Sequence, residues 1–180
     1  MNPTIALQEI RFPVGDFVLD PLVTDGKRMA LIEQIEQAPL RLRTALEGLS
    51  EEQIDTRYRE GGWTLRQVVH HLSDAQMNGF IRFKLALTEA RPEIKTYEEM
   101  LWAETADSRD APVELSLNLL EALHARWVIL LKSLPDSGFA HTFRHPQRGE
   151  LTIDSALQLY AWHGVHHTAH ITKLRERKGW

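Results

Sequence analysis

The sequence predicts an all-α protein, a four-helix bundle preceded by an extended N-terminal arm at residues 1–24. Apolar residues recur at helical spacing over several long segments. Threonine, serine or aspartate stands just before these segments, as is usual at a helix N-terminus. Proline and glycine are frequent in the arm, where a helix is not expected. No linker or repeat divides the rest, so residues 25–180 are expected to form a single domain with a sizeable core.

The first helix is expected to follow Asp25. Its apolar stripe would consist of Met29, Ile32, Ile35, Leu42, Ala45, Leu46 and Leu49. Pro39 falls inside this pattern and is expected to kink or restart the helix. A short capped turn should follow, because Ser50 and Gln53 have the spacing of a capping box.

The second long helix is predicted from about Thr64 to Glu89. Thr64 follows a double glycine and is a suitable N-cap. The apolar stripe of this helix is Leu65, Val68, Val69, Leu72 and Phe83. Residues 97–106, in the connection that follows, predict a shorter acidic helix.

The third helix is predicted over residues 112–134, with Asp110 as its cap. Its expected apolar stripe is Leu115, Leu119, Leu123, Trp127 and Leu130. Residues 135–151 are rich in Gly, Pro and His and predict a loop or small hairpin. Thr152 then opens the last helix, which should run to about Lys178.

Four histidines crowd one side of this last helix: His163, His166, His167 and His170. At 3.6 residues per turn, His163 and His167 fall nearest the middle of the apolar stripe, one turn apart, where two imidazoles can converge on one ion. The other two lie toward the edge of that stripe. A partly buried cluster that bonds backbone carbonyls and water is the alternative, but four histidines on one side favour a transition metal.

A working metal site needs at least one more ligand, and the chain has no cysteine to supply it. The best source is the pair His70 and His71 on the second helix. These two residues lie on opposite flanks of the apolar stripe, and periodicity alone does not choose between them. Asp74, one turn after His71, could orient a ligand, accept a proton or simply be solvated.

The remaining histidines and tryptophans favour structural roles. His124 lies beside an apolar stripe and is interpreted as a packing histidine, whereas His141 and His145 are expected at the surface, with a place beside the site as the alternative. Trp63, Trp102, Trp127 and Trp162 are expected in the core. The chain has no Gly-x-Ser-x-Gly, phosphate-binding glycine loop or His-Glu-x-x-His motif.

Two histidine-bearing segments make the chain similar to the DinB superfamily. These are residues 61–72 (GGWTLRQVVHHL) and 160–171 (YAWHGVHHTAHI), and residues 12–15 and 123–127 also agree. The likeness covers nearly the whole chain and is strongest with the YfiT-type branch of metal-dependent hydrolases.

This resemblance implies a helical bundle with a three-histidine metal site, one ligand from the second helix and two from the last. Carried onto this sequence, the ligands are His71, His163 and His167, with His166 and His170 as neighbours. It also implies a homodimer and one divalent ion per subunit. Zinc is the expected ion, and nickel is possible because an all-imidazole site does not select by affinity alone.

Three functions are compatible with such a site. Three neutral imidazoles leave the metal its full charge, which acidifies a bound water for hydrolysis of a small molecule. The same charge would activate a thiol, and relatives in this superfamily are associated with S-transfer from low-molecular-weight thiols such as bacillithiol. The third reading is a non-catalytic metal that only stabilises the bundle.

Composition and charge argue against several classes of binding partner. The formal net charge is -4 and no basic stripe is present, so neither nucleic-acid nor membrane binding is expected. A chain without cysteines, an export signal or a long apolar run suits the cytoplasm, where we expect this protein. A pocket between helices suits a small-molecule substrate, with residues 135–151 and 97–107 as candidates for its rim.

Overall fold

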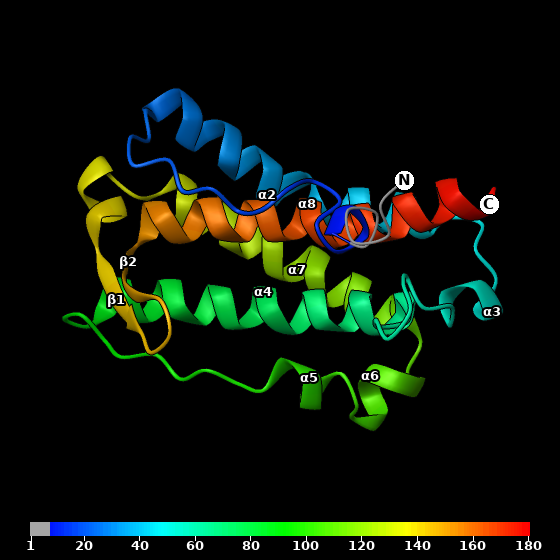
Figure 1. Ribbon diagram of the computed structural model, residues 1–180. Coiled ribbons are helices and arrows are strands. Elements are labelled where there is room, and N and C mark those ends of the chain that lie inside the picture. Colours follow the sequence, from blue (N-terminus) through cyan, green and yellow to red (C-terminus); the bar gives the residue numbers. More distant parts are fainter. Residues whose placement is uncertain (1–7) are drawn as a thin grey trace.

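The structure, a computed structural model that describes residues 8–180, is built around four long helices (Figure 1). These are α2 (Asp25–Leu46), α4 (Leu65–Thr88), α7 (Val113–Lys132) and α8 (Ile153–Lys178). Helices α7 and α8 each pack against both α2 and α4, which closes the bundle. The predicted four-helix bundle is confirmed. The first seven residues of the predicted arm lie outside the described part of the chain.

Helix α8 runs parallel to α2 and antiparallel to α4 (Figure 1). Near the start of the parallel pair, Arg28 bonds Asp154, and near its end Arg175 donates to the carbonyl oxygen of Ala45. Helices α4 and α7 also run in the same direction, so a chain segment must return along the bundle between them. Residues 89–112 make that return and cover one side of the molecule.

Side-chain caps explain where the long helices begin. The Thr24 hydroxyl accepts from the backbone N–H of Lys27 at the start of α2. Thr64 and Thr152 each form a complete capping box, at the starts of α4 and α8. Gly179, with φ of 69°, ends α8 in the left-handed conformation. The predicted starts after Asp25, Thr64 and Thr152 are therefore confirmed.

The first helix differs from its prediction in two respects. Of the two alternatives predicted for Pro39, the restart is wrong, because α2 is continuous over Asp25–Leu46, and the kink stays a prediction. Met29, predicted in the apolar stripe, is 54% exposed, whereas Ile32 and Ile35 are buried. The short helix α3 (Glu51–Ile54) follows with the predicted Ser50 capping box.

The connection between α4 and α7 contains two short helices, α5 (Glu99–Trp102) and α6 (Ala106–Asp110), where one was predicted. Asp110 was predicted to cap the third helix, but it ends α6 instead. The N-cap position of α7 is Pro112, which forms no side-chain cap. A proline at this position pre-sets the backbone for the helix without a capping side chain.

The apolar stripe predicted for α7 is partly wrong. Leu115 is 62% exposed and Leu119 is 44% exposed. The buried apolar residues are instead Val113, Leu117, Leu120, Leu123, Trp127, Val128 and Leu131. Leucine occurs around the whole circumference of this helix, so periodicity alone did not identify the face that packs on the bundle.

A β-hairpin connects α7 to α8, as the loop-or-hairpin prediction allowed. It follows the 3-10 helix η1 (Asp136–Ala140) and pairs β1 (Thr142–His145) antiparallel to β2 (Gly149–Thr152), with Phe143 opposite Leu151. The backbone N–H of Ile94 donates to the carbonyl oxygen of Arg144, which ties the α4–α7 connection to this hairpin.

Two apolar cores fill the bundle, one at each end. The hairpin-end core surrounds Phe83, Trp127 and Leu157, and the opposite core surrounds Leu65, Leu120 and Ile171. The four histidines of α8 and Gln76 of α4 lie in sequence between the residues of these two cores, and His71 lies next to Leu72, the last α4 residue of the opposite core. A polar layer thus crosses the middle of an otherwise apolar bundle.

The N-terminal segment lies along α8. Residues 8–11 are helical, and residues 12–24 have no regular secondary structure beyond a turn. Asp20 and Gln158 exchange two hydrogen bonds, from the Asp20 backbone N–H at 2.9 Å and to its carbonyl oxygen at 3.1 Å. Among the described helices, none combines the length and the apolar character that crossing a membrane requires.

Candidate metal centre

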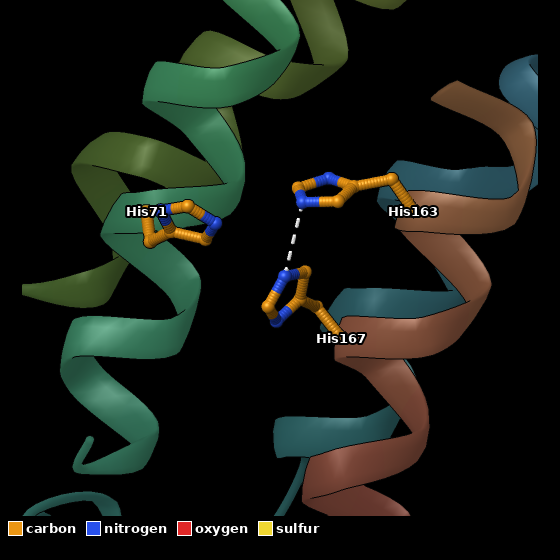
Figure 2. A group of neighbouring side chains, drawn as sticks. All are labelled: His71, His163 and His167. Carbon is orange, nitrogen blue, oxygen red and sulfur yellow. Dashed lines mark hydrogen bonds between the residues drawn. The ribbon is translucent and has the colours of Figure 1, made fainter. Parts of the chain in front are cut away.

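His163 and His167 of α8 face the middle of the bundle, one turn apart. Their Nε2 atoms are 3.0 Å from each other (Figure 2). His167 is buried, whereas His163 is partly exposed because it lines two cavities. The helical spacing predicted this convergence, and the structure contains it.

His71 completes the group from α4. Its ring centroid lies 5.4 Å from that of His163 and 4.8 Å from that of His167 (Figure 2). One nitrogen from each of the three residues can be chosen so that all lie within 4.8 Å of one another. The three predicted ligands therefore meet at one point between α4 and α8.

His70, the alternative that periodicity left open, faces another part of the protein. Its Nε2–H donates to the carbonyl oxygen of Ala111 at 3.1 Å, and its Nδ1 then accepts from the Ser116 hydroxyl at 2.8 Å. Both ring nitrogens are thus satisfied away from α8, and His70 is not available to the group.

Burial keeps the three converging imidazoles neutral. It lowers the pKa of His71 to about 4, and it lowers the pKa values of His163 and His167 well below 6.5, with neighbouring histidines adding to the effect. A neutral imidazole keeps the lone pair that a metal ion needs, and it loses that lone pair when protonated. The group therefore holds its ligand atoms ready at neutral pH.

The donor set fits a divalent transition metal. The Nδ1 atoms of His163 and His167 are buried without a hydrogen-bond partner in the described part of the chain, and their Nε2 atoms contact only each other. Trp63 supports the rings by packing, with its centroid 4.5 Å from His71 and 6.4 Å from His167. Three neutral nitrogens with open lone pairs are typical zinc or nickel ligands.

A second group, formed by His166, His167 and His170, has comparable spacing. However, the Nε2–H of His170 donates to the carbonyl oxygen of Arg11 at 3.1 Å. His166 stacks on Trp162, with ring centroids 4.5 Å apart and planes at 22°. These contacts favour a supporting role for both residues, in keeping with the prediction that they are neighbours of the ligands.

Two cavities meet at the histidines. The aromatic cavity, of about 280 Å³, is lined among others by Phe12, Tyr58, Trp63, Trp162 and His167. The hairpin cavity, of about 370 Å³, is lined among others by Arg82, Tyr97, His145, Arg148 and Tyr160. His71, Glu99, Met100, Trp162 and His163 line both. The hairpin and the α4–α7 connection, both predicted at the rim, line the second cavity.

Several residues take places that the sequence did not predict. His145 is only 8% exposed and lines the hairpin cavity. The predicted surface position is therefore wrong, and the alternative prediction, a place beside the site, is confirmed. Trp63 packs against the opposite core and also lines the aromatic cavity, Trp162 lines both cavities, and Trp102 is 37% exposed. Arg11 reaches the aromatic cavity from the N-terminal segment.

Three other predicted positions are settled by their contacts. His124 is buried, and its Nδ1–H donates to the carbonyl oxygen of Ile35 at 2.6 Å, as expected for a packing histidine. His141 is exposed at the opposite end of β1 from His145. Asp74 is partly buried, and burial together with Asp107 raises its pKa to about 6. Its side chain forms no hydrogen bond with a histidine in the described structure.

Comparison with known proteins shows the family. A model of the DinB superfamily matches residues 34–171. A protein of Bacillus mycoides strain KBAB4, named "Putative metal-dependent hydrolase", is 50% identical over 174 residues, which cover 97% of this chain and 100% of that protein. A protein of Bacillus cereus strain 03BB102 with the same name is 51% identical over the same coverage.

Two solved structures have a similar fold. YfiT from Bacillus subtilis, described as "a probable metal-dependent hydrolase with an unusual four-helix bundle topology", aligns with a TM-score of 0.94 and 44% identity, covering 96% of this chain and 99% of that one. The four-helix bundle protein TT2238 shares the fold alone, with a TM-score of 0.55 and 20% identity over 85% of this chain and 99% of that one. The chain belongs to the DinB superfamily and is a YfiT-like member of it.

Proposed function

We propose that this protein is a metal-dependent hydrolase of a small-molecule substrate, with one divalent ion per subunit held by His71, His163 and His167. The observation that carries the proposal is the convergence of three neutral imidazoles where two cavities meet. The names of the relatives support it. Zinc is the expected ion and nickel the alternative.

The ion, when bound, supplies Lewis acidity, which acidifies a water molecule and polarises an oxygen or sulfur atom of the substrate. Side chains around the ion would supply the other requirements of the reaction. Trp63 and Trp162 line the aromatic cavity together with the histidines and give it apolar walls. Glu99 lines both cavities beside the histidines, and its carboxylate can accept a proton from the attacking water and return it to the leaving group.

The test is an activity panel on zinc-loaded and nickel-loaded protein with small esters and amides. We expect hydrolysis of one of these classes, and we expect it to disappear in His163→Ala and after chelation. Stoichiometric metal binding without hydrolysis of either class would contradict the proposal.

A thiol S-transferase is the second candidate, and the two cavities favour it because the reaction needs two substrates side by side. The thiol sulfur would form a bond to the electrophile as the leaving group departs with its electron pair, and Glu99 would accept the thiol proton. Pairs of a low-molecular-weight thiol and an electrophile belong in the same panel. Thiol transfer without ester or amide hydrolysis would select this candidate.

We also propose that the protein assembles as a homodimer and binds no nucleic acid. Three apolar residues of α7, Leu115, Leu119 and Ile129, are exposed in the isolated subunit and support self-association. Light scattering at micromolar concentration should give the mass of a dimer. A monomer mass, or tight salt-sensitive DNA binding, would contradict these proposals.

A further inference from the structure

The hairpin cavity contains two arginines without an acidic partner. Arg82 projects from α4 and is partly buried, and Arg148 lies in the turn of the β-hairpin. Neither forms an ion pair within the described part of the chain. The more deeply buried arginines behave differently: Arg66 bonds two carboxylates and Arg28 bonds three. Positive charge is therefore left uncompensated on one wall of this cavity.

Arg82 is held in place by neutral groups. Its Nη1 donates to the Tyr160 hydroxyl oxygen at 2.9 Å, and its Nη2 donates to the carbonyl oxygen of Lys95 at 3.4 Å. These contacts fix the guanidinium between α4, α8 and the connection without neutralising it. A fixed guanidinium that keeps its charge is suited to a carboxylate or a phosphate.

Tyr160 adds a second donor. Its oxygen accepts from Arg82, so its own hydrogen remains for another acceptor, and the described structure provides none. Burial raises the pKa of Tyr160, which keeps the hydroxyl protonated at neutral pH. Gly79 makes room for this ring, because a Cβ at that position would lie 2.7 Å from Tyr160.

Other groups in the cavity do not cancel the charge. Burial, with Arg82 and Arg148 adding to it, lowers the pKa of His145, whose Nδ1 accepts from the backbone N–H of Gln147 at 3.2 Å. Glu98 and Glu99 are exposed, so solvent screens them. Glu99 also lines the aromatic cavity, whereas Arg82 and Arg148 do not, and neither Glu98 nor Glu99 forms an ion pair with these arginines in the described structure.

We propose that Arg82, Arg148 and the Tyr160 hydroxyl form a subsite for an oxyanion group of the substrate, a carboxylate or a phosphate. The proposal rests on the proposed function in one respect, that the reacting bond lies at His71 and His163, which line the same cavity. The substrate would then be an elongated anion. Its charged end would lie at the arginines, and its reactive part would lie at the histidines.

The experiment titrates inorganic phosphate and succinate separately into chelator-treated protein, followed by NMR signals of arginine Nε–H groups and the Trp162 indole. At least one anion should give saturable shifts. Arg148→Gln should weaken binding about tenfold, and Tyr160→Phe should weaken it by a smaller factor, because a charged contact is worth more than a neutral one. The tighter anion identifies the charged group as phosphate or carboxylate.

Arg126→Gln is the matched control, because Arg126 is exposed on α7 and lines neither cavity. It should bind both anions like the parent protein. Arg148 is exposed and its side chain makes no hydrogen bond in the described structure, so Arg148→Gln should fold even if Tyr160→Phe does not. Absence of saturable shifts with both anions, or an equal loss in Arg126→Gln and Arg148→Gln, would overturn the subsite.

Metal-free protein separates this proposal from the proposed function. Anion binding that occurs only after zinc loading and is insensitive to Arg148→Gln would overturn the subsite and leave metal-dependent hydrolysis standing. Anion binding by a protein that takes up no metal would support the subsite while the hydrolase proposal fails.

Discussion

His70 and His71 are adjacent in sequence, but their rings lie on opposite sides of α4. His70 is bonded to Ser116 and Ala111, whereas His71 faces His163 and His167 of α8. The two residues are almost equally buried, so the difference lies in the groups that each ring contacts. His70 meets groups that satisfy both nitrogens, and His71 meets two other neutral imidazoles.

Chelation should leave the fold intact. Two apolar cores flank the histidine layer and close the bundle from both ends, so the metal is not needed to bury the core. Chelator-treated protein should keep its helical circular dichroism at room temperature and lose part of its thermal stability and all activity. Complete unfolding on chelation would support a purely structural metal.

Acid should destabilise the metal-free protein between about pH 6.5 and 4. Burial lowers the pKa values of His71, His166 and His170 from 6.5 to about 4. As the pH falls, these histidines therefore become protonated at a higher pH in the unfolded chain than in the folded protein. Each such proton lowers the free energy of unfolding by about 1.4 kcal/mol per pH unit. Stability should be constant above that window.

Urea unfolding at several pH values measures this slope. His170→Gln should make it shallower by about one proton, whereas His141→Gln, in the exposed loop, serves as the control. A slope that His170→Gln does not change would show that this histidine is not held neutral in the folded protein.

Gly79→Ala should destabilise the bundle by about 1–3 kcal/mol, because overpacking forces shifts in a well-packed core. The new Cβ would lie 2.7 Å from both Trp127 and Tyr160. Gly164→Ala is the matched control on α8, since its Cβ would meet Ala38 at an ordinary 3.5 Å. It should be neutral or stabilising, because alanine favours helix over glycine. Thermal unfolding of both variants tests the difference.

Glu99→Gln should lower the rate of the metal-loaded enzyme about 10²-fold or more if its carboxylate carries the proton. Metal content should be unchanged, because Glu99 is not among the grouped histidines. Glu98→Gln is the control, since Glu98 lines the hairpin cavity but not the aromatic one. Equal activity of Glu99→Gln and the parent protein would exclude Glu99 as the proton carrier.

Sequence alone predicted what is local. Helix starts with a capping side chain were found at Thr64 and Thr152, and the 163/167 pair follows from helical spacing within one element. The start of α7 was predicted within one residue, but its predicted cap, Asp110, was wrong because Pro112 precedes the helix without a side-chain cap. The face of α7 was missed because leucines surround it.

The surroundings of the site could not be predicted in the same way. His145, Arg82 and Tyr160 come from three different elements, and only the packing of the hairpin over α4 and α8 brings them together. The contact of His170 with Arg11 likewise joins residues at opposite ends of the chain. No periodicity within one segment carries such information. A polar side chain on an otherwise apolar helix face is the one local signal available.

Metal stoichiometry in single histidine variants tests the central claim most directly. Each variant would be purified, loaded with zinc, dialysed and analysed by elemental mass spectrometry, with circular dichroism to verify folding. His71→Ala, His163→Ala and His167→Ala should lose stoichiometric metal, because two imidazoles do not make a closed site. His166→Ala and His170→Ala should keep one ion per subunit. Loss of metal in His166→Ala, with retention in His163→Ala, would contradict the assignment.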